Sequence, residues 1–242
     1  GASIAFHLAR RGLKPTVLER RFVAAGATGR SSGVVRMHYD LEAESRLAWA
    51  SFQYFRDWRE IVGGECGFTR TGFLQIVPPP LNEQLRANVV MHQHIGIPSL
   101  VVSAADVHRL APIFATEDFE LAAYEPESGY ADPSGTAAAF LQAARARGAQ
   151  LVQECQVTAI RTQGGRVSQV ETSRGAFSAA IVVNAAGPWA AEVGRMVDLD
   201  LPVDTWRHET AFIRRPSAMG PTHPTVIDFV NSMYFRAETG GL

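Results

Sequence analysis

The sequence predicts an α/β fold in which a part with alternating strands and helices is interleaved with a second, β-rich part. Two observations predict it. Segments 2–18 and 177–188 each combine a helix with an apolar strand, which indicates βα connections. Segments 151–172 and 203–237 contain apolar runs separated by turn residues, which indicates ββ connections. We expect the first part over 1–75 and 149–200, and the second over 76–148 and 201–242.

In the first half of the chain, apolar residues at helical spacing alternate with short apolar runs. Gly12 ends the first helix and Ser103 caps a short one, because these residue types favour helix ends. We assign the aromatic stripe Trp49, Phe52, Phe55 and Trp58 to core packing. The predicted elements are helix 2–11, strand 15–18, a loop rich in Gly and Ser, helix 41–62, strand 72–77, helix 81–95, helix 104–110 and strand 119–125.

The second half of the chain is rich in strands. Gly148 ends an alanine-rich helix, and Gly164-Gly165 is typical of a hairpin turn. Pro188 starts a helix, since proline is favoured at the first helical position. The predicted elements are helix 133–147, strands 151–162, 166–172 and 177–184, a helix from 188, and strands 203–215, 225–230 and 233–237.

Composition and charge limit the classes of partner. The 242 residues are 46% hydrophobic and 19% charged, which is typical of a globular protein with a sizeable core. A net charge of −1 gives no basis for nucleic acid or an anionic membrane as partner, and no apolar run reaches the ~18 residues of a membrane span. Cys66 and Cys155 form no CxxC pair, so we expect no disulfide, no metal site and a cytoplasmic location.

The first stretch that carries chemistry is GASIAFHLARRGLKPTVLER, at 1–20. In a dinucleotide-binding βαβ unit, the last glycine of GxGxxG lets the helix pack closely, and an acidic residue after the second strand binds the ribose hydroxyls. Gly1 and Ala5 supply small residues, and Glu19 ends the strand TVLE 18 positions after Gly1. A glutamate there favours a ribose without a phosphate. A generic helix–strand pair with an exposed glutamate is the alternative.

Two further stretches fit a dinucleotide. The loop GATGRSSGVVRMHY, at 26–39, offers backbone N–H groups and hydroxyls, which are donors to phosphate oxygens. In IVVNAAGPWA, at 181–190, an apolar strand ends in small residues before a helix, and ligands of doubly wound folds lie outside such strand ends. An ordinary surface loop and a tight strand-to-helix turn are the respective alternatives.

Together, these stretches resemble the FAD-dependent D-amino-acid oxidase superfamily, in its sarcosine oxidase, sarcosine dehydrogenase and glycine oxidase branch. The resemblance extends over nearly the whole chain, through YADPSG, VTAI and MYFRAETGGL. It implies a FAD-binding, Rossmann-like domain of the glutathione-reductase type, interleaved with a β-rich substrate domain. Gly1 matches the last glycine of the family's Gly-x-Gly-x-x start, so we expect the chain to be a fragment, inactive alone.

The resemblance also implies which residues contact FAD. Glu19 binds the adenosine ribose with Arg20 beside the adenine, and Val157 pairs its backbone with the adenine edge. The other implied contacts, along the pyrophosphate, the ribityl chain and the flavin, are Gly1, Ala27, Thr28, Ser32, Gly33, Val34, Ala186 and Gly187. We expect noncovalent FAD, because no histidine motif for covalent attachment stands out.

The reaction that the resemblance implies is oxidation of the C–N bond of a small amino acid or N-methyl amino acid, by hydride transfer to the flavin. An electron acceptor or partner subunit is a further expected partner. The substrate carboxylate needs a cation, and the arginine fork binds carboxylates bidentately. Arg36 is the first candidate, and we expect His38 and Tyr234 near the substrate. A solvated charge at Arg36 and a core aromatic at Tyr234 are the alternatives.

Two other functions stay open from the sequence. A FAD-dependent 2-hydroxy-acid oxidase or dehydrogenase would bind the flavin identically, and a non-catalytic dinucleotide-binding subunit would keep the fold without the chemistry. TGRSSG disfavours a NAD-dependent dehydrogenase, since NAD folds need no second loop. We expect no metal pair at His92 and His94, because residues two apart on a helix diverge in direction. Arg207-His208-Glu209 alternates faces on a predicted strand, so we assign it no catalysis.

Overall fold

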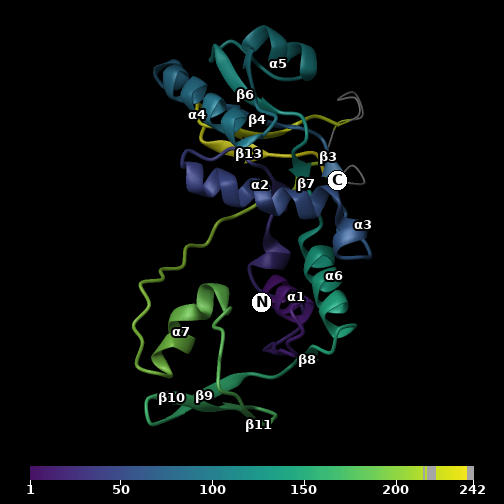
Figure 1. The fold of residues 1–242 in the computed structure, drawn as a ribbon. Helices are drawn as coiled ribbons and strands as arrows, with labels where there is room; N and C mark the ends of the chain where they lie inside the picture. Colours follow the sequence, from purple (N-terminus) through teal and green to yellow (C-terminus); the bar gives the residue numbers. More distant parts are fainter. Residues whose placement is uncertain (215, 217–221, 239–242) are drawn as a thin grey trace. The chain divides into compact units, whose positions relative to one another are not determined.

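The computed structural model describes residues 1–214, 216 and 222–238, and the chain forms two compact units (Figure 1). The first unit comprises 1–31, 62–65 and 133–209, and the second comprises 32–61, 66–132 and 210–242. Both units are therefore built from segments that are distant in the sequence. The compact units have different boundaries from the FAD-binding and substrate parts predicted from the sequence, which divide the chain at 75, 148 and 200. That functional division stays a prediction. The end of MYFRAETGGL lies outside the described residues.

The first unit combines a parallel strand pair, an antiparallel three-stranded sheet and short helices. β1 pairs with β8 in parallel, and the N–H of Glu19 extends this ladder by donating to the Val152 carbonyl at 2.9 Å. The other sheet has the order β11-β10-β9. The elements are α1 (Ala2–Arg10), β1 (Thr16–Leu18), η1 (Thr28–Arg30), α6 (Pro133–Arg145), β8 (Gln150–Val152), β9 (Val157–Gln163), β10 (Arg166–Thr172), β11 (Gly175–Ser178), η3 (Gly187–Trp189) and α7 (Ala190–Arg195).

The glycine hairpin predicted in this unit is confirmed. Gly164 and Gly165 join β9 to β10 with φ angles of 59° and 73°. These left-handed values are the ones that a two-residue type I′ turn requires, and glycine adopts them without steric cost.

Two predicted strands differ in the structure. The strand expected over 177–184 ends at Ser178, and the described part of the strand expected over 203–215 is not a strand. Apolar side chains of both segments face solvent: Ile181 is 82% exposed and Trp206 is 84% exposed. A strand needs a hydrogen-bonded neighbour. Within the part of the chain that the structure describes, pairing of the first segment with β10 ends at Ala179, and the second segment is not paired with a strand.

The second unit is built on a mixed five-stranded sheet in the order β13-β12-β4-β6-β5, beside a small sheet in the order β2-β7-β3. β12 runs parallel to β4, and the other neighbours in the larger sheet are antiparallel. The elements are β2 (Val34–Val35), α2 (Glu42–Arg56), α3 (Trp58–Ile61), β3 (Thr69–Arg70), β4 (Phe73–Ile76), η2 (Pro79–Leu81), α4 (Asn82–Ile95), β5 (Leu100–Ser103), α5 (Ala104–Leu110), β6 (Leu121–Glu125), β7 (Gly129–Tyr130), β12 (Thr225–Asp228) and β13 (Met233–Phe235).

Different helices cover the two faces of the five-stranded sheet (Figure 1). Val107 of α5 packs with Leu74 on one face, and Leu85 of α4 packs with Ala123 on the other. Side chains alternate along a strand, so Gln75 lies on the α4 face while its neighbour Leu74 lies on the α5 face. None of the described helices is both long enough and apolar enough to cross a membrane.

The aromatic stripe predicted to pack in the core does so. Phe52 is buried in a cluster with Val35 and Met37, and Trp49 stacks on it with the ring centroids 5.7 Å apart. The predicted helix 41–62 is interrupted at Asp57, which separates α2 from α3. The core of the second unit therefore fixes the segment that carries Arg36, between Val35 and Met37.

The capping residue predicted for α5 is also confirmed. The Oγ of Ser103 accepts the N–H of Asp106 at 3.2 Å, and the Asp106 carboxylate accepts the N–H of Ser103 at 2.9 Å. This reciprocal pair satisfies two N–H groups that a helix start would otherwise leave unpaired.

We predict that Ser103→Ala lowers the free energy of unfolding by about 1 kcal/mol, because the N-terminus of α5 loses its capping acceptor. Urea denaturation measures the change. Ser51→Ala is the matched control: its exposed hydroxyl only donates back to the Leu47 carbonyl within α2, so we expect a change within about 0.5 kcal/mol. An equal effect of the two substitutions would contradict the capping role.

Candidate functional site

The first unit contains a groove of about 1110 Å³. Its walls come from α1, β1, the loop after β1, the start of β9 and the segment around η3. The volume exceeds the ~300–1,000 Å³ of typical small-molecule sites, so the groove has room for a dinucleotide. Eight of the residues predicted to contact FAD line it together: Gly1, Glu19, Arg20, Ala27, Thr28, Val157, Ala186 and Gly187.

The other three residues predicted to contact FAD belong to the second unit. The Ser32 carbonyl accepts a hydrogen bond from Nε of Arg236 at 2.6 Å, and the Gly33 carbonyl accepts one from the N–H of Ala131 at 2.9 Å. Val34 begins β2. The segment is therefore firmly held within its own unit, and its contacts with the cofactor stay a prediction.

Glu19 stands at the end of β1, as predicted. Its Oε1 accepts the N–H of Arg21 at 2.8 Å, which fixes the carboxylate beside the groove. The guanidinium of Arg20 lies 4.6 Å from the ring centroid of Trp189, which also lines the groove. This cation–π contact ties the end of β1 to η3, so the two walls are positioned together.

The loop between Ala24 and Arg30 folds tightly around its glycines. The N–H of Gly29 donates to the Ala24 carbonyl at 3.0 Å, and a Cβ at Gly29 would lie 2.3 Å from that oxygen. A Cβ at Gly26 would lie 3.2 Å from the Trp189 ring. Small residues therefore let the backbone approach the groove closely, as a pyrophosphate contact requires.

The residues of the groove fit FAD in chemical type. A carboxylate at a strand end can accept hydrogen bonds from ribose hydroxyls, and backbone N–H groups at the N-terminus of α1 can donate to phosphate oxygens. At Gly187, an added Cβ would meet no atom within 4 Å, so the groove is open there.

In the second unit, the segment after β2 turns alternate side chains to opposite sides. Val35 and Met37 enter the core, whereas Arg36 lies against the sheet. Nη1 of Arg36 donates to the His38 carbonyl at 2.8 Å and to Oε1 of Gln75 at 3.4 Å. Arg36 is therefore a half-buried cation in a fixed place, and the alternative of a solvated loop charge does not describe it.

Aromatic rings hold the Arg36 guanidinium from other directions. Its carbon lies 4.4 Å from the ring centroid of Tyr39 and 5.6 Å from that of Phe73. Contacts of this kind stabilise the charge without using its hydrogen-bond donors.

Tyr234 lies on the same sheet face as Gln75. Tyr234 pairs with Ile227 across β13 and β12, and Ile227 pairs with Gln75 across β12 and β4. Paired residues of neighbouring strands point to the same face, and two strand spacings separate Tyr234 from Gln75 by roughly 10 Å. Tyr234 is 47% exposed, so it is not a core aromatic.

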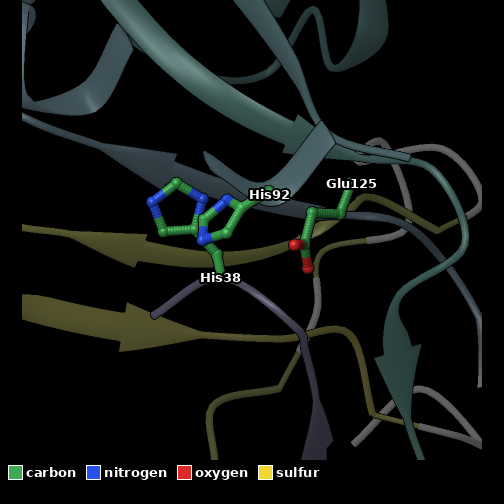
Figure 2. A group of neighbouring side chains, drawn as sticks. All are labelled: His38, His92 and Glu125. Atoms are coloured by element: carbon green, nitrogen blue, oxygen red, sulfur yellow. The ribbon is translucent and has the colours of Figure 1, made fainter. Parts of the chain in front are cut away.

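His38, the remaining predicted catalytic residue, is completely buried. Its ring lies 4.4 Å from that of His92, and Glu125 completes the cluster shown in Figure 2. The predicted contact of His38 with substrate stays a prediction. Sequence reasoning missed His92 and Glu125, although His92 continues the buried helical stripe of Leu85 and Val89 in α4.

Burial shifts the protonation equilibria of this cluster. It raises the pKa of Glu125, against hydrogen bonds to that carboxylate and the charge of Arg36. Burial, together with the smaller effects of the charges of His92 and Arg36, lowers the pKa of His38 to about 3. It also lowers the pKa of His92, against a hydrogen bond with the Tyr39 carbonyl and the charge of Asp40. Both imidazoles are therefore neutral at pH 7.

Comparison with known proteins identifies the class. The DAO family model, described as FAD dependent oxidoreductase, matches residues 1–242, so the chain belongs to this family of FAD-dependent oxidoreductases. The predicted fold class, the family and FAD as the cofactor of that family are thereby confirmed.

The relatives include proteins of different stated roles. The chain is 33% identical over 251 residues to mitochondrial sarcosine dehydrogenase of Mus musculus, covering 100% of this chain and 27% of that protein. It is 28% identical over 249 residues to the mitochondrial pyruvate dehydrogenase phosphatase regulatory subunit of Mus musculus, covering 100% and 28%. The chain thus spans about a quarter of the length of these curated relatives.

A solved structure has the same fold. The crystal structure of L-proline dehydrogenase from P. horikoshii matches with a TM-score of 0.88 and 25% sequence identity, covering 99% of this chain and 64% of that chain.

We predict that Glu19→Ala weakens FAD binding roughly ten- to hundredfold, because a hydrogen bond to a charged group contributes about 1.5 to 3 kcal/mol. Titration of the apoprotein with FAD, followed by flavin fluorescence, gives the Kd. Glu209→Ala is the control, since this exposed carboxylate belongs to the same unit and does not line the groove. A Kd that Glu19→Ala leaves unchanged would remove Glu19 from the binding site.

Proposed function

We propose that the natural protein oxidises the C–N bond of a small amino acid or N-methyl amino acid, with FAD in the groove of the first unit. The observation that carries the proposal is the placement of Arg36, whose guanidinium is held against a sheet face by Gln75 and two aromatic rings. Similarity to a sarcosine dehydrogenase and to the structure of a proline dehydrogenase supports an amine substrate over a 2-hydroxy acid.

The substrate anchor is the free edge of the Arg36 guanidinium. Within the described residues, both side-chain hydrogen bonds of Arg36 involve Nη1. The edge formed by Nε and Nη2 is therefore left for a carboxylate, which it binds through two parallel hydrogen bonds. The Tyr234 hydroxyl adds a second polar group on the same face.

The flavin, when bound, supplies the redox chemistry by accepting a hydride from the carbon beside the nitrogen. The contribution of this chain is to bind and orient. Because the His38 carbonyl and Gln75 hold Nη1, the anchor needs little reorganisation when substrate arrives. A fixed anchor converts binding energy into orientation of the reacting carbon.

A non-catalytic subunit is the second candidate function. Similarity to the pyruvate dehydrogenase phosphatase regulatory subunit favours it, since that name describes regulation of another enzyme. The two candidates differ in one measurable property. A catalytic protein turns over amine substrates with an added electron acceptor, and a regulatory subunit with bound FAD does not.

Turnover by the FAD-loaded natural polypeptide tests the proposal. Sarcosine, glycine and L-proline are compared with lactate and 2-hydroxyglutarate, using a redox dye as acceptor. We expect dye reduction with at least one amine and none with the hydroxy acids. No turnover with any amine would favour the non-catalytic candidate.

We predict that Arg36→Ala lowers kcat/KM for the amine by one to two decades, because a charge-assisted carboxylate contact contributes about 1.5 to 3 kcal/mol. Arg36→Lys keeps the charge without the fork, so its kcat/KM lies between the other two values. The flavin content of each variant, measured by absorbance, verifies that the cofactor site is intact.

Arg46→Ala is the control for the Arg36 variants. Arg46 is an exposed arginine of α2 that pairs with Glu42, so kcat/KM should not change. If Arg36→Ala behaves like Arg46→Ala, Arg36 is not the anchor.

A further inference from the structure

Three potential metal ligands converge in the interior of the second unit (Figure 2). His38 follows β2, His92 lies near the end of α4, and Glu125 ends β6. Each offers one ligand atom, and these atoms all lie within 4.8 Å of one another. All three side chains are completely buried.

The cluster leaves polar atoms without partners. Both ring nitrogens of His38, Nδ1 of His92 and Oε1 of Glu125 make no hydrogen bond within the described part of the chain. A buried polar atom without a partner costs about 1 to 3 kcal/mol, and native structures contain few of them. Four such atoms within one buried cluster therefore need an explanation.

With Glu125 ionised, hydrogen bonds within the cluster can satisfy only part of it. Nε2 of His92 faces the Tyr39 carbonyl at 2.9 Å, so its one N–H is already used and Nδ1 presents a lone pair. An ionised Glu125 has no hydrogen to donate. One N–H of His38 can donate to either Nδ1 of His92 or Oε1 of Glu125, so the other acceptor and the second ring nitrogen of His38 stay without a donor.

The outer atoms of two ligands are already held in the way that metal sites require. The Tyr39 carbonyl fixes the ring of His92, and the second carboxylate oxygen of Glu125 accepts the N–H of Met37 at 2.9 Å and the hydroxyl of Ser128 at 2.7 Å. Metal-binding histidines and carboxylates typically have such partners, because these fix the tautomer and the direction of the lone pair.

We propose that His38, His92 and Glu125 bind a divalent transition-metal cation of the Zn²⁺ type. Two imidazole nitrogens and one carboxylate oxygen are a ligand set of Zn²⁺ and Co²⁺. Ligand bonds of about 2.0 to 2.2 Å place neighbouring ligand atoms roughly 3.3 Å apart in a tetrahedral site. The three ligand atoms now lie within 4.8 Å of one another, so metal binding would draw them closer together. This proposal replaces the sequence-based expectation that the chain has no metal site.

The metal ion would join three elements of the second unit. His38 belongs to the segment that carries Arg36, and the other two ligands belong to α4 and β6. Nearby charges act in both directions: Asp40 favours a cation at His92, and Arg36 opposes one at His38. The role that follows is structural, since the ligands are buried and the cation would fix the backbone that follows Arg36.

Metal content tests the proposal without reference to enzyme activity. The natural polypeptide, purified without a histidine tag, is stripped with a chelator, incubated with Zn²⁺ and desalted, and its zinc is measured by mass spectrometry. We expect about one equivalent per chain and a higher Tm than that of the stripped protein. Co²⁺ in place of Zn²⁺ should give the visible absorption of a tetrahedral site, and this measurement requires only the wild-type protein.

Substitutions locate the ion. His92→Ala and Glu125→Gln should each lose the bound metal, and His94→Ala is the matched control, since His94 is exposed on the same helix. Circular dichroism and flavin content show whether each variant folds. Less than ~0.1 equivalent of zinc in the wild-type protein, with no Co²⁺ band, would overturn the proposal and indicate a hydrogen-bonded chain through the three residues. Equal loss of metal from the His92 and His94 variants would also overturn it.

Discussion

The hydrogen bond from the Met37 N–H to the buried Glu125 carboxylate is the contact on which the second unit's site depends. It ties the segment after β2 to the end of β6. Because side chains alternate along this extended segment, holding Met37 in the core turns Arg36 toward the sheet. The position of the candidate substrate anchor therefore follows from one carboxylate in the interior.

Helix α4 holds the same segment from its other end. Nδ2 of Asn88 donates to the Asp40 carboxylate at 2.8 Å, and His92 bonds the Tyr39 carbonyl. Asn88 and His92 are one turn apart, so they present polar groups on one side of the helix. The apolar stripe of α4 packs on the sheet while this polar pair fixes the loop, and one helix thereby serves both stability and the site.

The burial of the Glu125 carboxylate is not expected to stabilise the second unit by itself. A hydrogen bond to a charged group contributes about 1.5 to 3 kcal/mol, whereas removing a carboxylate from water costs several kcal/mol. The N–H groups of Met37 and His38, the Ser128 hydroxyl and the charge of Arg36 all favour the ionised Glu125, yet burial still raises the pKa of this carboxyl. A bound cation would supply the remaining stabilisation, which connects the position of Arg36 to the proposed metal ion.

The sequence predicted what depends on local chemistry. The cap at Ser103, the hairpin at Gly164 and the aromatic stripe of α2 follow from residues close in the chain, and the structure contains all three. Glu19 and Thr28 belong to neighbouring motifs, and they line one groove. Each of these features needs only a few contiguous residues to specify it.

Features that need distant partners were not predictable in the same way. The apolar segment around Ile181 is predicted to be a strand from its sequence, but a strand forms only where it pairs with a neighbouring strand. The cluster of His38, His92 and Glu125 depends on a helix, a strand and a loop meeting in space, and no spacing in the sequence encodes that meeting. The one feature of the sequence that points to this cluster is His92, whose spacing from Leu85 and Val89 places it on the buried side of α4.

The most direct test of the central claim is the absorption spectrum of the flavin-loaded natural protein under anaerobic conditions, on mixing with sarcosine or another small N-methyl amino acid. We expect the oxidised flavin band to disappear at a rate that saturates with substrate concentration. An oxidised spectrum that persists with every amine tested, in protein whose flavin dithionite still reduces, would contradict the assignment of an amine-oxidising flavoenzyme.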